Sequence, residues 1–360
     1  MKPTADLVTA TREYETWLSS RTAIVRADLR EKHERMCESP FVFLRATFYW
    51  WIQRWQSLGR PFADAPRSLA VGDLHVENFG TWRDAEGRLI WGINDFDESC
   101  ELPYTHDLVR LATSACLASR DGQFSLSNRM MCDAIVEGYG ECLECGGRPI
   151  VLAERHMWLR DIALSNPRDP VVFWEKLLKL PLARDGVPRA LLMAALPKGF
   201  ASVRISRRVA GVGSLGRPRF VAIAESAGGL VAREAKAWAP SAATRLRASA
   251  DDVARRLLPQ VIRAVDPGFA IRRPWIVRRL APDCSKIEVD DLPGKRDEQK
   301  LLRAMGWETA NVHGYSSARR TAIARDLSSR QSGWLLAAAS AMADATVEDW
   351  RLWKRQGRGT

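Results

Sequence analysis

Two short acidic segments separated by a hairpin-like stretch constrain this chain more than any other feature. The first segment is Gly72–Asn78 (Gly-Asp-Leu-His-Val-Glu-Asn), and the second is Asn94–Glu98 (Asn-Asp-Phe-Asp-Glu). Apolar residues 69–71 predict a short buried strand before the first segment, and residues 79–94 predict two strands around the turn-forming residues 84–87. Because a hairpin returns the chain to its starting point, the sequence predicts that the two acidic segments lie side by side.

The side chains of these segments suit Mg²⁺ binding and phosphoryl transfer. Mg²⁺ prefers hard oxygen ligands and usually takes one or two carboxylates, with phosphate and water oxygens completing the shell. Asn78 and Asp95 provide such oxygens, and Asp73 can accept the proton of an attacking hydroxyl. Acidic residues in loops often only cap helices or turns. Here, however, four polar residues directly follow a buried strand, where unpaired charge is costly, and the pattern therefore favours a functional site.

The two segments resemble the catalytic and metal loops of the protein-kinase-like superfamily, most closely those of the aminoglycoside and choline phosphotransferases. Those enzymes read His-Gly-Asp-Leu-His-x-x-Asn and then Ile-Asp-Phe, and this chain has Val71 in place of the first His. The resemblance implies that Asp73 is the catalytic base, with His75 and Asp107 as further catalytic residues. It implies that Asp107 braces the loop backbone from a helix. The implied Mg²⁺ ligands are Asn78, Asp95 and Asp97.

The chain more closely resembles an uncharacterised bacterial family, whose conserved blocks read SPFxFxRG, GDxHxxNFG and NDFDE. Ser39–Arg45 is similar to the first block, Asn78–Gly80 completes the second, and residues 94–98 match the third. This resemblance covers most of the chain, from residue 20 to residue 350. It implies a fold and a nucleotide cofactor, but it carries no known substrate.

Gly211–Gly216 (Gly-Val-Gly-Ser-Leu-Gly) forms a glycine-rich loop, called the glycine loop below. A dinucleotide-binding loop of this pattern needs a following helix, but residues 220–225 are strand-like. Strand, glycine loop and strand in succession is the kinase arrangement, in which the loop covers the phosphates of ATP. A plain hairpin turn is the alternative interpretation. The predicted cofactors are ATP and Mg²⁺, and the predicted nucleotide-binding residues are Gly211, Gly213, Ser214, Gly216, Arg233 and Lys236.

The third strand of this region, residues 230–235, departs from the kinase pattern. Arg233 stands where a lysine should contact the phosphates, and Arg is not equivalent to Lys in geometry. Lys236 is the alternative, although three residues further on it points to the opposite face of the strand. The helix expected over residues 242–265 contains no Glu to pair with such a lysine. Replacement carboxylates could come from Glu234, Asp251 or Asp252.

The glycine loop follows the acidic segments, whereas in kinases it precedes the catalytic loop. The sequence therefore predicts an α+β, protein-kinase-like fold of two lobes in circularly permuted order. Predicted domains are residues 1–199, with the catalytic and metal loops, 200–292, the β-rich nucleotide lobe, and 293–360, which completes the helical lobe. Expected helices are 5–36, 41–58, 104–119, 125–143, 150–163, 170–180, 242–265, 297–317 and 331–356, and expected further strands are 203–209, 220–225, 230–235, 275–280 and 286–289.

Charge predicts the class of partner. The 360 residues carry a formal net charge of +11, and residues 201–282 hold sixteen Lys or Arg against five Asp or Glu. A local basic surplus indicates an anionic partner, which fits nucleotide phosphates. A nucleic-acid partner is not expected, because no recognition motif accompanies the charge. The predicted partners are a nucleotide and a hydroxyl-bearing acceptor, with a small molecule preferred to a protein.

The sequence also predicts a cytoplasmic protein. It has no apolar run of the length that a membrane span needs, and its first residues lack the apolar core of a signal peptide. Seven scattered cysteines fit reduced thiols. Cys142 and Cys145 form a Cys-x-x-Cys pair, but no second pair stands at zinc-site spacing, so a metal or redox role is not expected.

Two buried-looking side chains invite structural interpretations. Arg45 lies in an aromatic-rich helix, where a buried guanidinium needs a partner, either a carboxylate of the site or solvent reached by snorkelling. His313 is expected to be a satisfied structural His rather than a proton shuttle.

Two alternatives to phosphoryl transfer remain open from the sequence. Kinase-like folds also transfer AMP when ATP binds in a reversed pose, and Arg208, Arg217 and Arg219 around the glycine loop could support that pose. The second alternative is a pseudokinase that binds nucleotide without chemistry. The missing lysine favours it, whereas the intact Asp73 and Asp95 oppose it.

Overall fold

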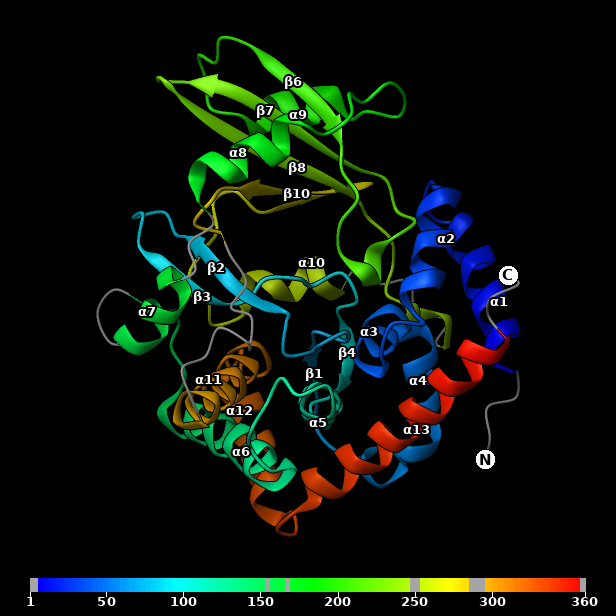
Figure 1. Cartoon of the computed structure of the whole chain (residues 1–360). Coiled ribbons are helices and arrows are strands. Elements are labelled where there is room, and N and C mark those ends of the chain that lie inside the picture. The colour runs from blue at the N-terminus through cyan, green and yellow to red at the C-terminus, as the bar shows by residue number, and fades with distance from the viewer. Residues whose placement is uncertain (1–5, 153–155, 166–168, 247–252, 285–294, 357–360) are drawn as a thin grey trace.

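The computed structural model describes residues 6–152, 156–165, 169–246, 253–284 and 295–356. Figure 1 shows a β-rich part at the top of the view and a helical part below it. The strands of the β-rich part come from the middle of the chain, so the helical part is built from segments on both sides of it. The mixture of helices and strands confirms the predicted α+β class.

A five-stranded antiparallel sheet forms the β-rich part. Its strands, in spatial order, are β6 (Val203–Arg207), β7 (Arg219–Ser226), β8 (Gly229–Ala237), β10 (Trp275–Leu280) and β9 (Ala270–Arg272), and two helices pack on it, α8 (Pro170–Leu178) and α9 (Arg189–Ala195). Alternate residues of a strand face opposite sides of a sheet. Phe220 and Ala222 of β7 pack with α9, whereas Val221 and Ile223 pack with α8. The helices therefore cover opposite faces.

The helical part is organised around one central helix. Its elements are α1 (Leu7–Ser19), α2 (Arg26–Arg35), α3 (Pro40–Ala46), α4 (Phe48–Leu58), α5 (Thr105–Arg120), α6 (Asn128–Cys145), α7 (Met157–Ser165), α11 (Lys295–His313), α12 (Ser317–Ser329) and α13 (Trp334–Gln356). Every residue of α5 from Thr105 to Ala118 is buried, as is typical of a helix in the middle of a core. Glycines let α6 and α11 approach closely. A Cβ on Gly138 would lie 1.9 Å from the backbone oxygen of Arg303.

Two small sheets carry the acidic segments. Their strands are β1 (Arg67–Ala70) paired with β4 (Cys100–Pro103), and β2 (Phe79–Arg83), β3 (Leu89–Ile93) and β5 (Ile150–Val151). Strand β1 leads into the first acidic segment. The β2–β3 hairpin pairs Phe79 with Ile93, so it brings the second segment back beside the first. The predicted hairpin is confirmed.

Several predicted segments need correction. The helices expected over residues 5–36 and 41–58 are each divided into two helices. The helix expected over residues 331–356 is present as α13, and α12 lies before it. Ser39 caps α3 and Pro40 begins it, which explains one boundary. The stretch 181–200, between the helix expected over residues 170–180 and the strand expected over residues 203–209, contains α9. The strand expected over residues 286–289 lies outside the described residues.

The prediction of one long helix over residues 242–265 is wrong. The described residues there form short helices only, η3 (Ala242–Leu246), α10 (Val253–Leu257) and η4 (Leu258–Gln260). Pro259 accounts for the end of α10, because proline has no N–H to donate and disfavours helical backbone at the preceding residue.

None of the helices in the described part of the chain combines the length and the apolarity that crossing a bilayer requires.

Glu308 of α11 is a buried acid beneath β3. Its carboxylate accepts a hydrogen bond from the amide of Asn311 (2.9 Å) and lies 3.4 Å from the backbone N of Ile93. A Cβ on Gly92 would lie 2.2 Å from this carboxylate, so the glycine makes room for it. Burial raises the pKa of Glu308 from its usual 4.5 to about 7.

Replacing Glu308 with Gln is expected to stabilise the protein at pH 8 and to have little effect near pH 4.5. Between these values the folded state keeps a proton that the unfolded chain has lost, so the wild type loses stability as pH rises toward 7. Glutamine stays neutral and avoids this loss, which is on the order of 3 kcal/mol. Urea unfolding at both pH values measures the difference. An equal change at both would contradict the assignment.

Candidate functional site

Asp107 of α5 holds the first acidic segment in place. Its carboxylate accepts hydrogen bonds from the backbone N–H of Val71 (2.6 Å) and of Gly72 (3.1 Å). The rings of His106 and His313 each lie 3.1 Å from the same carboxylate. Burial would raise the pKa of Asp107, but hydrogen bonds to these rings hold it well below its usual range. The bracing contact expected of Asp107 is present, and His313 has the structural place expected of it.

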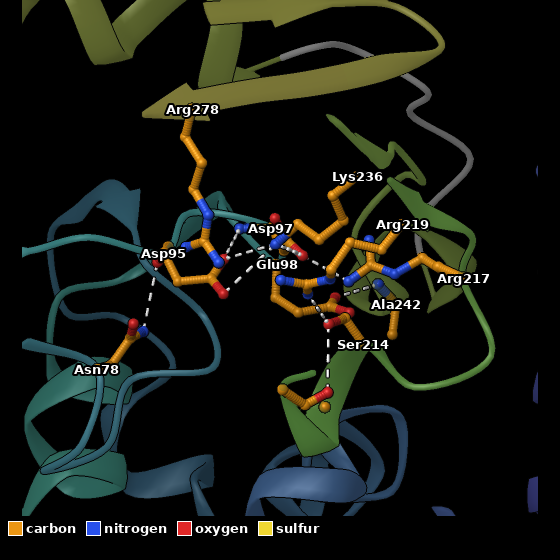
Figure 2. Close-up of polar contacts among 12 residues, drawn as sticks. Asn78, Asp95, Asp97, Glu98, Ser214, Arg217, Arg219, Lys236, Ala242 and Arg278 are labelled. Carbon is orange, nitrogen blue, oxygen red and sulfur yellow. Dashed lines mark hydrogen bonds and ion pairs between the residues drawn. The ribbon is translucent and has the colours of Figure 1, made fainter. Parts of the chain in front are cut away.

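The two acidic segments touch at a glycine. Gly72 adopts a φ of +81°, and a Cβ there would lie 2.2 Å from the backbone oxygen of Glu98. Asn78 links the segments as well. Its amide nitrogen donates to the backbone oxygens of Asp73 (3.2 Å) and Asp95 (3.3 Å), the second of which Figure 2 shows. These bonds use only the amide nitrogen, so they leave the amide oxygen, the atom that a metal would need.

Asp97 is fixed between two cations. Its carboxylate lies 2.5 Å from Lys236 Nζ and 2.5 Å from the Arg217 guanidinium (Figure 2). Burial would raise the pKa of Asp97, but Lys236 and Arg217 outweigh burial and hold it well below its usual range. Lys236 Nζ also lies 3.5 Å from Asp95. We expected Asp97 to be an auxiliary metal ligand, and its pairing instead fits a residue that positions Lys236.

Asp73 has a partner that sequence reasoning missed. Arg110 of α5 binds its carboxylate and also donates to the backbone oxygen of Leu44 (2.9 Å). The fully buried guanidinium lies over the rings of Phe48 and Trp51. Burial raises the pKa of Asp73, and Arg110 opposes this. An arginine on an apolar helix near Asp107 was the available signal, because a buried guanidinium requires an anion.

The glycine loop joins β6 to β7 and lies over Asp73. A Cβ on Gly213 would be 2.9 Å from the backbone oxygen of Arg45 and 3.2 Å from the Asp73 carboxylate. Ser214 Oγ accepts a hydrogen bond from Arg219 (2.7 Å). Gly216 packs against helix α2, where a Cβ would lie 2.4 Å from Leu29. Close approach on two sides therefore explains these glycines.

Lys236, and not Arg233, lies on the face of the sheet that is turned toward the acidic segments. Arg233 donates to the backbone oxygen of Ala195, at the end of α9, on the face of the sheet turned away from the acidic segments. Lys236 lies on the other face and reaches Asp95 and Asp97. The expectation that Arg233 binds phosphates is corrected, because the pleat directs position 236 to the site.

Comparison with protein families matches residues 24–157 and 192–356 to the family described as "Uncharacterized protein conserved in bacteria (DUF2252)". The chain belongs to this family. The matched ranges contain both acidic segments, the glycine loop and Lys236, whereas α8 lies in the unmatched stretch. Neither the curated proteins nor the solved structures compared with the chain gave a match. The resemblance to an uncharacterised bacterial family is confirmed.

In this member of the family, Glu234 of β8 forms ion pairs with three arginines. Arg219 and Arg278 lie 2.9 and 2.7 Å from its carboxylate, and Arg208 binds it as well. Burial would raise the pKa of Glu234, but the arginines hold it well below its usual range. The sequence had left open a pair between Glu234 and Lys236, and Glu234 pairs with the three arginines instead. The other two acids considered for that part, Asp251 and Asp252, lie outside the described residues.

Two pockets meet at Asp95 and Gly211. The larger, called the arginine pocket, has a volume of about 180 Å³ and is lined by Arg208, Arg219, Arg263, Arg278 and Arg279, with Trp82 and Phe96 among its aromatic residues. The smaller, called the catalytic-loop pocket, has a volume of about 60 Å³ and is lined by Asp73, Asn78, Lys32, Arg45, Tyr14 and Tyr49. One carboxylate, that of Asp95, therefore faces both spaces.

His75 and Arg45 belong to the wall of the catalytic-loop pocket. The buried His75 ring meets the Phe41 ring edge-on, with centroids 6.2 Å apart. Arg45 forms an ion pair with Glu77 (2.7 Å), a carboxylate of the first acidic segment. The partner expected for Arg45 is therefore present within the site.

A metal here could not rely on side-chain carboxylates alone. Within the described ranges, no three His, Cys, Asp or Glu side chains come together as a preformed metal site. Asn78 and Asp95 would supply two oxygens, and phosphates and water would supply the rest, which is the usual way proteins hold Mg²⁺. Cys142 and Cys145 are free thiols, as expected.

Proposed function

We propose that this chain is an ATP- and Mg²⁺-dependent phosphotransferase that acts on a hydroxyl group. One observation carries the proposal: Asp73, Asn78 and Asp95 meet beneath the glycine loop and opposite Lys236. These are the parts that kinases use, namely a proton acceptor, two oxygen ligands for Mg²⁺, a loop over the phosphates and a lysine.

The arrangement of the strands supports a kinase-like, two-lobed fold in permuted order. The glycine loop joins the first two strands of the five-stranded sheet, and Lys236 lies on the third, β8. Protein kinases place their loop and lysine in the same relation. The difference is that here the nucleotide lobe follows the catalytic loop in sequence, so helices from both chain ends complete the other lobe.

Each residue has a separate part in the proposed reaction. Asp73 accepts the proton of the attacking hydroxyl, and Arg110 holds its carboxylate in position. Asn78 and Asp95 would hold Mg²⁺, which neutralises charge on the transferred phosphate when bound. Lys236 offers its ammonium to the phosphates from the other side. Because the catalytic-loop pocket is small, a small-molecule acceptor fits better than a protein segment.

The arginine pocket favours a second candidate, transfer of AMP. Five arginines line a space that also reaches Asp95. Such a lining suits the terminal phosphates of a reversed ATP better than it suits an adenine ring. ATP labelled at the α- or the γ-phosphate separates the two reactions. Label transferred only from the γ position supports the first proposal, and label transferred only from the α position supports the second.

Asp95→Ala is expected to abolish Mg²⁺-dependent stabilisation by ATP. In the wild type, ATP with Mg²⁺ at a hundred times its Kd should stabilise the folded state by about 2.7 kcal/mol, and EDTA should remove most of this. The variant loses the carboxylate that faces both pockets, so ATP should give the same small shift with Mg²⁺ or EDTA. Thermal unfolding with ATP, GTP or no nucleotide measures the effect.

Asp344→Ala is the matched control, since Asp344 is an exposed acid that pairs with Arg120, at the opposite end of α5 from Asp107. It should respond to ATP as the wild type does. A Mg²⁺-dependent shift that survives in Asp95→Ala would remove Asp95 from the metal site. Nucleotide binding without transfer of either label would leave the pseudokinase as the better interpretation.

A further inference from the structure

Lys32 of α2 is a buried cation for which the described residues supply no carboxylate partner. Its side chain is 4% exposed, and it lines the catalytic-loop pocket. The ammonium lies 3.4 Å from the backbone oxygen of Gly213 and 5.8 Å from the ring centroids of Tyr14 and Tyr49. Among the described residues, none provides a carboxylate oxygen within ion-pairing distance of it.

This arrangement is costly unless an anion completes it. Removing an ammonium from water costs several kcal/mol, and two ring faces with one distant carbonyl replace only part of its hydration. Burial lowers the pKa of Lys32 to about 8, so the group still carries its charge at neutral pH. A protein that keeps such a group gains little stability from it, which indicates a ligand.

The nearby acids are already engaged. Glu15 of α1 binds His33 (2.6 Å), as Asp73 binds Arg110 and Asp97 binds Lys236 and Arg217. Glu98 accepts a hydrogen bond from the backbone of Ala242, and burial raises its pKa to about 7. The acids around Lys32 therefore have partners of their own.

Arg45 adds a second cation to the same wall of the pocket. Its guanidinium binds Glu77, but its Nε is buried and makes no hydrogen bond to the residues that the structure describes. Helix α2 is itself fixed to the glycine loop. Val25 N donates to Gly216 O (2.8 Å), and Asp28 pairs with Arg207. The position of Lys32 is therefore set by contacts that do not depend on a ligand.

We propose that Lys32, with Arg45, binds a phosphate-type oxyanion in the catalytic-loop pocket. The oxyanion is either the phosphoryl group being transferred or an anionic group of the acceptor. The site itself follows from the geometry around Lys32, and only the choice between these sources rests on the proposed function. Helix α2 thereby contributes a binding residue that lies outside the acidic segments and the glycine loop.

The first experiment uses inorganic phosphate and orthovanadate as probes in thermal unfolding and calorimetry, without nucleotide and with Mg²⁺-ADP. Both ions should stabilise the wild type. Lys32→Gln should weaken their binding about ten-fold or more, because a hydrogen bond to a charged group is lost, and Lys32→Arg should retain most of it. Lys179→Gln, which changes the exposed lysine that directly follows α8, is the matched control and should bind as the wild type does.

The melting temperature of Lys32→Gln without ligand provides a second test. Lys32→Gln removes a buried charge, so without ligand it should melt at the same temperature as the wild type or higher. A large fall in melting temperature would show that Lys32 serves the packing of α2, and would overturn the proposal. Equal oxyanion affinity of the wild type and Lys32→Gln would overturn it as well, and so would an absence of oxyanion binding to the wild type under both conditions.

Two nucleotides then identify the source of the oxyanion. If Lys32 holds the transferred group, Lys32→Gln should weaken binding of the non-hydrolysable analogue AMP-PNP about ten-fold more than that of ADP. If it holds the acceptor, both nucleotides should bind unchanged while phosphate binding is lost. Oxyanion binding that depends on Lys32 in a protein that binds no nucleotide would support the site and would count against the phosphotransferase proposal alone.

Discussion

Asp73→Asn is expected to slow phosphoryl transfer by about 10²- to 10⁴-fold, the usual contribution of a positioned general base. Asparagine keeps the shape of the side chain but cannot accept the proton of the acceptor hydroxyl. Nucleotide affinity should change little, because the metal oxygens of Asn78 and Asp95 remain. Release and transfer of label from γ-labelled ATP measure the rate, and thermal shift with Mg²⁺-ATP measures binding.

Because Asp73 pairs with Arg110, Asp73→Asn should also lower the stability of the folded protein. Asparagine leaves a buried guanidinium without its anion, so some stability is lost, and rates must be measured well below the melting temperature. Asp344→Asn is the control, because it removes an exposed carboxylate with only a surface ion pair. If Asp73→Asn kept the wild-type rate while fully folded, the catalytic assignment of Asp73 would be wrong.

Asp97→Asn is expected to destabilise the protein by about 3–5 kcal/mol, the range for breaking a buried ion pair at one partner. The change leaves both Lys236 and Arg217 without their shared carboxylate; these two side chains are buried, and that of Asp97 is only 9% exposed. Nucleotide binding should weaken as well, because Lys236 would lose its fixed position. Urea unfolding measures the first effect, and calorimetry with Mg²⁺-ATP measures the second.

A double-mutant cycle with Lys236→Met separates positioning from metal binding. If Asp97 holds Lys236, Asp97→Asn should cost less in the Lys236→Met background than in the wild type, and the part due to Arg217 should remain. A metal ligand would behave differently, since its removal would change the Mg²⁺ dependence of nucleotide binding in either background. Little loss of stability, together with a changed Mg²⁺ requirement, would restore Asp97 to the metal site.

The sequence by itself determined the local parts of the site. A hairpin between the two acidic segments had to bring them together, and the hydrogen bonds of Asn78 show that it does. The glycine loop between two strands was also foreseen, whereas the bracing carboxylate of Asp107 was expected only from the family resemblance. The hairpin and the glycine loop depend on short stretches of chain, in which the turn residues and the alternation of apolar residues largely fix the geometry.

Only the tertiary structure decided which distant side chains complete the site. Alternation along β8 predicts that Arg233 and Lys236 face opposite ways, but the packing of α8 and α9 on the sheet decides that Lys236 faces the acidic segments. Arg110 reaches Asp73 from α5, 37 residues further along the chain, and Lys32 of α2 reaches Gly213, 181 residues away. Such partners depend on how whole elements pack together, which no local pattern of residues encodes.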